Sequence, residues 1–179
     1  MMKILKSLLL IIAAIAIVLI VVGLFLPQKA HVERSITVDA PRDAVFQQVN
    51  TFKDYNSWSP WYQRDPNAKY EFTGPESGVG AKMAWESDNS QVGNGSQEIV
   101  ESDYPSHVKT KLLFGEDPNP GYAVFTLEEI DVQKTKLTWS FDADFGYNIM
   151  GRYFGVFMDD MLGPDYEKGL QSLKQKIEN

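Results

Sequence analysis

The feature that most constrains this chain is an uncharged apolar run near its start, LLLIIAAIAIVLIVVGLFL, at residues 8–26. As an α-helix a run of this length spans roughly 28 Å, close to the hydrocarbon thickness of a bilayer. A helix built from it has no polar face, so a buried helix of a soluble domain is the weaker alternative. The run predicts one N-terminal transmembrane helix and divides the chain into a membrane anchor, residues 1–28, and a domain, residues 29–179.

The flanks of this run bear on cleavage and orientation. A secretory signal has a shorter apolar region followed by a small-x-small site, whereas this run continues into LPQKA at residues 26–30. We therefore expect an uncleaved, single-pass signal-anchor in the cytoplasmic membrane. The positive charges on the two sides of the run are nearly equal in number: Lys3, Lys6 and the amino terminus precede it, and Lys29, Arg34 and Arg42 follow it, so the positive-inside rule alone does not fix the orientation. Short anchors led by lysine usually keep that end cytoplasmic, which favours an extracytoplasmic domain over one on the cytoplasmic face.

The rest of the chain is acidic. Two of its 17 Lys+Arg, Lys3 and Lys6, precede the run, so residues 29–179 carry 15 basic against 24 acidic side chains, a net charge of −9. Phosphate backbones and anionic lipid repel such a domain, so nucleic acid is not an expected partner. The sequence has no cysteine, and its two histidines, His31 and His107, are far apart. We therefore expect no thiolate chemistry, no metal site and no cofactor.

Beyond Pro27 the hydrophobic pattern takes the period of a β-strand. Residues 31–40 place Val32, Arg34, Ile36 and Val38 on one face. Arg34, the polar member, is expected near the open end of the strand or, alternatively, paired with a buried carboxylate. A helix should follow over residues 44–52. The next stretch, residues 55–62, contains four aromatic side chains, and Pro60 should break any helix there.

Six alternating runs follow, separated by turns rich in Gly, Pro, Asn and Asp. We expect strands at residues 69–73, 81–87, 96–103, 108–114, 122–130 and 136–145. Helical periodicity returns over residues 149–177, where Gly163-Pro164 should kink or interrupt the helix. The expected fold class is α+β: a curved antiparallel sheet of about seven strands wrapped around a long C-terminal helix, preceded by one transmembrane helix.

One face of the predicted sheet is unusually aromatic. Such a sheet either fills its interior with side chains or encloses a cavity for an apolar ligand. Ordinary core packing is the alternative for every residue on that face. The residues expected to line a ligand pocket are Trp58, Trp61, Phe72, Met83, Trp85, Phe114, Trp139, Phe141, Phe154, Phe157, Met158 and Met161. Polar groups that could orient a ligand include Gln97, Thr110, Tyr122 and Thr126.

Several segments together resemble one superfamily. They are VERSITVDAP at residues 32–41, WSPW at 58–61, GVGAKMAW at 78–85, GRYFG at 151–155 and LGPDYEKGL at 162–170. The pattern is similar to the START-like, Bet v 1-type helix-grip (SRPBCC) superfamily, in its polyketide cyclase/dehydrase and lipid-transport group. The WSPW run resembles a bacterial subgroup with an N-terminal membrane anchor. The resemblance covers about residues 30–178 and implies a deep hydrophobic tunnel between sheet and C-terminal helix that binds lipids, sterols or polyketides.

Three functions remain open from the sequence. The leading hypothesis is a membrane-tethered protein that binds a hydrophobic small molecule or lipid in this tunnel. The first alternative is a cyclase- or dehydratase-like enzyme acting on an apolar carbonyl substrate, with Asp142, Asp144, Asp159 or a tunnel tyrosine as acid or base. The second is an envelope interaction module with a filled core. No catalytic motif is present that would identify catalytic residues, and the oligomeric state stays open.

Overall fold

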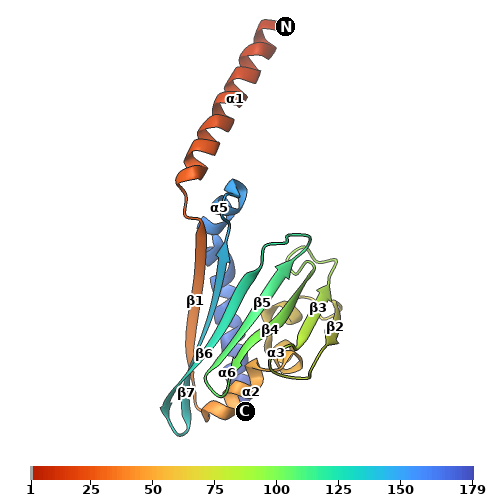
Figure 1. Ribbon diagram of the computed structural model, residues 1–179, viewed down its shortest axis with the longest axis vertical. Helices are drawn as coiled ribbons and strands as arrows, with labels where there is room; N and C mark the ends of the chain where they lie inside the picture. The colour runs from red at the N-terminus through yellow and green to blue at the C-terminus, as the bar shows by residue number, and fades with distance from the viewer. Residues whose placement is uncertain (1) are drawn as a thin grey trace.

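Most of the N-terminal helix projects away from the remainder of the protein, and its lower end lies next to α5, Ile149–Val156 (Figure 1). The computed structural model describes the backbone of residues 2–179 and side chains from Ile4 onward. Helix α1 spans Met2–Phe25, and its segment Ile4–Phe25 is long and apolar enough to cross a membrane. Within Ile4–Phe25 every residue is exposed except Gly23, which is buried. The alternative of a helix buried inside a soluble domain is therefore wrong.

Seven strands form one antiparallel sheet. Their bounds are β1 Lys29–Val38, β2 Lys69–Thr73, β3 Lys82–Glu86, β4 Gly95–Asp103, β5 His107–Phe114, β6 Gly121–Asp131 and β7 Lys134–Asp144. The order β1-β7-β6-β5-β4-β3-β2 makes β2 through β7 a meander, and β1 joins its far edge by pairing with β7. The predicted meander and strand number are confirmed, with boundaries within two residues of those expected.

Three short helices connect β1 to β2. They are α2 Arg42–Val49, α3 Phe52–Trp58 and α4 Pro60–Arg64. Helix α2 ends three residues earlier than expected, because Asn50 and Thr51 leave the helical conformation and α3 begins at Phe52. Pro60 does break the helix there: it takes the first position of α4, where its missing N–H costs no hydrogen bond.

The C-terminal helical region has two parts, α5 Ile149–Val156 and α6 Met158–Glu178. The interruption lies at Phe157, so the prediction of an interruption at Gly163-Pro164 is wrong, while the alternative of a kink there stays a prediction. Helix α6 runs on through Pro164, its seventh residue, although a proline beyond the first turn removes one backbone hydrogen bond of the helix. Gly163 has another role: a Cβ there would collide with the guanidinium of Arg34.

Arg34 lies in the middle of β1, opposite Trp139 of β7, so the expectation that it sits near the strand end is wrong. Its side chain crosses the surface of α6 and donates to Asp159 at 2.8 and 3.0 Å and to Glu167 at 2.8 Å. Both carboxylates are exposed, so the alternative of a buried carboxylate partner is also wrong. The pairing joins β1 to α6 at the protein surface.

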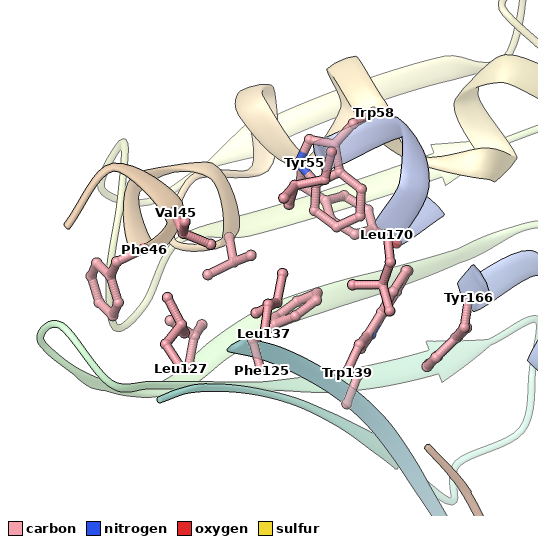
Figure 2. Close-up of a cluster of buried hydrophobic side chains, with 14 of the residues drawn as sticks. Val45, Phe46, Tyr55, Trp58, Phe125, Leu127, Leu137, Trp139, Tyr166 and Leu170 are labelled. Carbon is pink, nitrogen blue, oxygen red and sulfur yellow. The ribbon is translucent and has the colours of Figure 1, made fainter. Parts of the chain in front are cut away.

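The space between the sheet and α6 is filled by aromatic side chains (Figure 2). Trp139 of β7 stacks on Tyr166 of α6 with ring centroids 3.9 Å apart. Trp58 and Phe125 pack against the same indole at 5.5 and 5.1 Å, and Leu170 is also buried in this cluster. The helix therefore rests on a packed aromatic core at the place where the family resemblance implies a tunnel.

Candidate functional site

The candidate site is a small cavity beside this core, beneath α3 and α4. Its volume is about 60 Å³. One buried water needs about 10–15 Å³ of such space, so the cavity holds a few waters or a short group of ligand atoms. Its lining residues are Tyr55, Asn56, Ser59, Trp61, Tyr70, Met83, Trp85, Val92, Gln97 and Phe114. The lining contains no residue of α6, so the cavity does not lie where the resemblance places a tunnel.

Strand register places the aromatic wall. Trp85 of β3 lies opposite Gly95 of β4, and Gly95 lies opposite Phe114 of β5, so all three positions share one face. A Cβ at Gly95 would come within 2.5 Å of the Trp85 indole. Because Gly95 has no side chain, the rings of Trp85 and Phe114 meet across it at 6.2 Å. The Trp85 Nε1–H donates to the Val92 carbonyl at 3.3 Å, which fixes the indole against the cavity.

Two side-chain amides face this mostly apolar space. Gln97 lies opposite Met83 in the sheet and is 6% exposed, while Asn56 at the end of α3 is 7% exposed. Within residues 4–179 neither amide is hydrogen-bonded to another protein group, and neither is among the side-chain polar atoms that are fully closed off from solvent without a partner. Because their polar atoms stay accessible, these amides can bind water or the polar end of a ligand in the cavity. The cavity thus combines apolar walls with two free hydrogen-bonding groups.

The cavity is electrically neutral within the described part of the chain: no Asp, Glu, His, Lys or Arg lines it. Its titratable groups are two tyrosines. Burial raises the pKa of Tyr55 well above its usual range, and burial is also the main cause that raises the pKa of Tyr70, with the charge of Asp65 adding to it. Both hydroxyls therefore stay protonated at physiological pH and act as neutral hydrogen-bonding groups, not as bases.

The carboxylates considered for an enzyme lie elsewhere. Asp142 accepts from His31 Nδ1 at 2.8 Å on the outer surface, and Asp144 accepts from the Gly146 N–H at 2.9 Å in a turn. Asp159 is held by Arg34, whose hydrogen bonds lower the pKa of that carboxyl. None of the three lines the cavity.

An open groove adjoins the cavity between α3, α4 and the edge strand β2. Its volume is about 570 Å³, and it shares Asn56 and Tyr70 with the cavity. The partly exposed rings of Tyr62 and Phe72 form its walls, and Lys53 lies at its margin. Cavity and groove together provide space for an elongated molecule with one end inside and the remainder at the surface.

The sequence-predicted lining residues fall into three groups. Trp61, Met83, Trp85 and Phe114 line the cavity, and Phe72 lines the groove. Trp58, Trp139, Phe141 and Met158 are buried in the core. The other three are exposed: Phe154 lies on α5, Phe157 lies between α5 and α6, and Met161 lies on α6.

Several cavity residues were not predicted. Tyr55, Asn56 and Ser59 belong to the aromatic segment whose tryptophans were identified. The sequence does not show which polar side chains of this segment face inward, because that depends on the turn at Ser59 between α3 and α4. Gln97 was a candidate ligand-orienting group, and its position on the same strand face as Met83 could have favoured it over the other candidates.

Comparisons with known proteins place the domain in a family. The family model described as polyketide cyclase/dehydrase and lipid transport matches residues 29–178. No curated protein sequence matches the chain significantly.

Solved structures share the fold at low identity. An aromatase/cyclase, Zhui, from Streptomyces sp. R1128 is 14% identical with a TM-score of 0.60, covering 84% of this chain and 94% of that one. A START superfamily protein from Mycobacterium smegmatis is 13% identical with a TM-score of 0.57, covering 83% and 97%. A protein from Arthrobacter aurescens is 16% identical with a TM-score of 0.57, covering 82% and 87%. At such identities the likeness shows the fold alone. With a helix-grip fold and a family match over nearly the whole domain, the chain belongs to the polyketide cyclase/dehydrase and lipid-transport family.

Proposed function

We propose that this protein is a membrane-tethered binding protein for an apolar molecule with one polar end, such as a lipid acyl chain with its carboxyl or ester group. The polar end binds Asn56 and Gln97 inside the cavity, and the apolar part lies along the groove beside Tyr62 and Phe72. Helix α1 serves as an uncleaved, single-pass anchor in a bacterial cytoplasmic membrane, with the domain on its extracytoplasmic side.

The observation that supports binding most strongly is the pair of amides without partners in an aromatic cavity. Polar groups at the wall of a mostly apolar cavity are the usual means by which a site orients a bound ligand. A ligand oxygen or hydroxyl would satisfy them. Their neutrality favours an uncharged polar group or a protonated acid over a phosphate.

The cavity's size and composition bear on chemistry. Its volume of about 60 Å³ is too small for a whole polyketide, so only the end of a ligand enters. The groups within reach are amides, a serine and tyrosines whose pKa is raised, and none of these is a base at neutral pH. The site therefore supports holding a ligand rather than converting it.

Photo-crosslinking tests this function in the full chain. The protein is embedded in lipid nanodiscs with a photoactivatable palmitate analogue, and the labelled peptides are mapped by mass spectrometry. We expect two labelled regions: α1, which contacts the bilayer, and the segments of the cavity and groove around Trp61, Tyr62 and Phe72. Labelling restricted to α1 would show that the domain does not take up the acyl chain.

A matched pair of variants isolates the polar end of the ligand. Gln97→Leu removes a cavity amide, whereas Gln133→Leu makes the same substitution in the exposed β6–β7 turn. Losing one hydrogen bond of 0.5–1.5 kcal/mol should reduce cavity labelling by roughly two- to tenfold. Gln133→Leu should leave it unchanged, and equal labelling in all three proteins would contradict the role of Gln97.

A further inference from the structure

The end of the domain next to α1 exposes a cluster of large apolar side chains. Met150 is 78% exposed, and Tyr147, Phe154 and Phe157 are each at least half exposed. We call these four residues the collar. They belong to α5 and its flanks, and α5 lies at the foot of α1 (Figure 1).

Charge distinguishes the collar from the rest of the domain. Residues 145–158 read FGYNIMGRYFGVFM and contain no carboxylate, although the exposed Asp144, Asp159 and Asp160 border them and the domain as a whole has a net charge of −9. Their one charged side chain, Arg152, is 3% exposed and therefore does not contribute to the surface. The collar is thus an uncharged apolar patch on an acidic domain, unlike a surface that faces water alone.

Helix α5 packs along the last turns of α1. The Tyr153 hydroxyl donates to the Leu19 carbonyl at 2.8 Å. Leu19 lies six residues before Phe25, the end of α1, which corresponds to about 9 Å along the helix axis. Gly23 permits this contact, because a Cβ there would collide with Ile149. Any bilayer that surrounds α1 as far as Phe25 therefore also reaches the level of α5.

Arg152 holds the two helices together. Its guanidinium donates to the Leu24 carbonyl at 2.9 Å, to the Gly23 carbonyl at 3.4 Å and to the Gly146 carbonyl at 2.6 and 2.8 Å. Gly23 and Leu24 have two of the terminal carbonyls of α1, where the helix dipole favours a cation. The direction of α1 relative to the domain is therefore set by a buried charge and not by a free linker.

From this arrangement we infer that the collar inserts into the headgroup and upper acyl region of the same bilayer that holds α1. The partner is the lipid surface, because the collar is continuous with the proposed span and shares its depth. Aromatic and methionine side chains on a helix whose one charged side chain is buried suit that boundary. This inference rests on the proposed membrane anchoring, and it is independent of ligand binding in the cavity.

Insertion would also orient the site. Phe114, at the end of β5, lies at the same end of the sheet as Lys29 and Asp144, because β5, β6, β7 and β1 pair in register. That end faces α1 (Figure 1). With the collar in the bilayer, the Phe114 side of the cavity is held toward the membrane.

The absence of cysteine from the chain allows a direct test by spin labelling of the full protein in phosphatidylcholine vesicles. Single variants Met150→Cys and Phe154→Cys place labels on the collar. Ile12→Cys reports on α1, and Val132→Cys is the aqueous control: Val132 is 76% exposed in the β6–β7 turn, at the opposite end of the sheet. Collisions with oxygen and with a water-soluble nickel chelate are measured at each site.

We expect the oxygen-to-nickel ratio at Met150 and Phe154 to approach that at Ile12 and to exceed that at Val132 several-fold. A ratio at Met150 equal to that at Val132, with Ile12 still in lipid, would overturn the inference and leave the anchor intact. Shielding of Met150 from both reagents would also overturn it, in favour of a protein partner. If Ile12 itself were aqueous, the proposed anchor would fail together with the inference.

Discussion

Trp139 offers a quantitative test of the packed core beneath α6. Its indole stacks on Tyr166 and meets Trp58, Tyr55, Trp61 and Phe125 edge-on or tilted, with centroids 5.1–6.0 Å apart. Yet its Nε1–H, buried in the core, has no hydrogen-bond partner among the described residues. The same side chain therefore contributes much packing and carries one unsatisfied donor.

The two properties predict different costs for two substitutions. Trp139→Ala removes the whole ring and should cost about 3–5 kcal/mol. At 2–4 °C per kcal/mol for a domain of this size, the midpoint of thermal unfolding should fall by roughly 6–20 °C. Trp139→Phe keeps an aromatic ring and removes the unsatisfied donor, whose burial costs about 1–3 kcal/mol. Packing loss and relief should nearly cancel, so the midpoint should stay within about 4 °C.

Circular dichroism of the full chain in a nonionic detergent measures both midpoints, with Val132→Ala in the exposed β6–β7 turn as the control. If Trp139→Ala had the same midpoint of thermal unfolding as the wild type, the packing under α6 would not depend on the Trp139 ring. If Trp139→Phe were as damaging as Trp139→Ala, the unpaired indole N–H would not be the burden assigned to it. Either result would refute the reasoning.

Three further predictions concern stability and coupling. Glu178 accepts hydrogen bonds from the Asp39 N–H and from Lys174, and these bonds lower the pKa of its carboxyl below the ordinary 4.5. The ionised carboxylate therefore stabilises the fold above pH 4.5, and this stabilisation is lost as the pH falls through the lowered pKa. Glu178→Gln should therefore lower the unfolding midpoint at pH 7, and the difference from wild type should shrink below about pH 4.5, where a constant difference would contradict the assignment. Arg152→Met leaves the Gly23 and Leu24 carbonyls without that donor, so trypsin should cut after Lys29 faster than in wild type, as followed by gel electrophoresis; an unchanged rate would show that the guanidinium does not hold the junction. Gln97→Leu removes a buried amide without a partner, so its midpoint should equal or exceed that of wild type by differential scanning fluorimetry, whereas a marked fall would indicate that the amide stabilises the ligand-free protein.

The sheet could be predicted from the sequence because its signals are local. Strand alternation and Gly- or Pro-rich turns recur through residues 69–145, so the meander follows from the pattern alone. The break between α5 and α6 has no such signal. Gly163-Pro164 is the obvious helix breaker in the sequence, yet α6 continues through it. The glycine is needed there for a tertiary reason that the local sequence does not show, because the Arg34 guanidinium occupies the space of a side chain at that position.

The site was harder to predict than the fold. Trp58, Trp61, Trp85 and Trp139 are all inward-facing aromatic residues, and no local pattern in the sequence distinguishes a core position from a cavity-lining one. The structure separates them by tertiary contact: Trp58 and Trp139 pack against Tyr166 or each other, while Trp61 and Trp85 also reach the cavity. Which ring fills a core and which borders a void depends on partners distant in sequence, and periodicity contains no information about them.

The position of the cavity is the central claim of this account, and ligand stoichiometry in a cavity-filling variant tests it most directly. Met83→Trp places an indole in the cavity, whereas Met150→Trp makes the same substitution at an exposed collar position. Palmitate bound to the full chain is counted by native mass spectrometry after release from detergent micelles. We predict that wild type and Met150→Trp bind one palmitate that Met83→Trp does not; equal binding by all three proteins would contradict a site beneath α3 and α4.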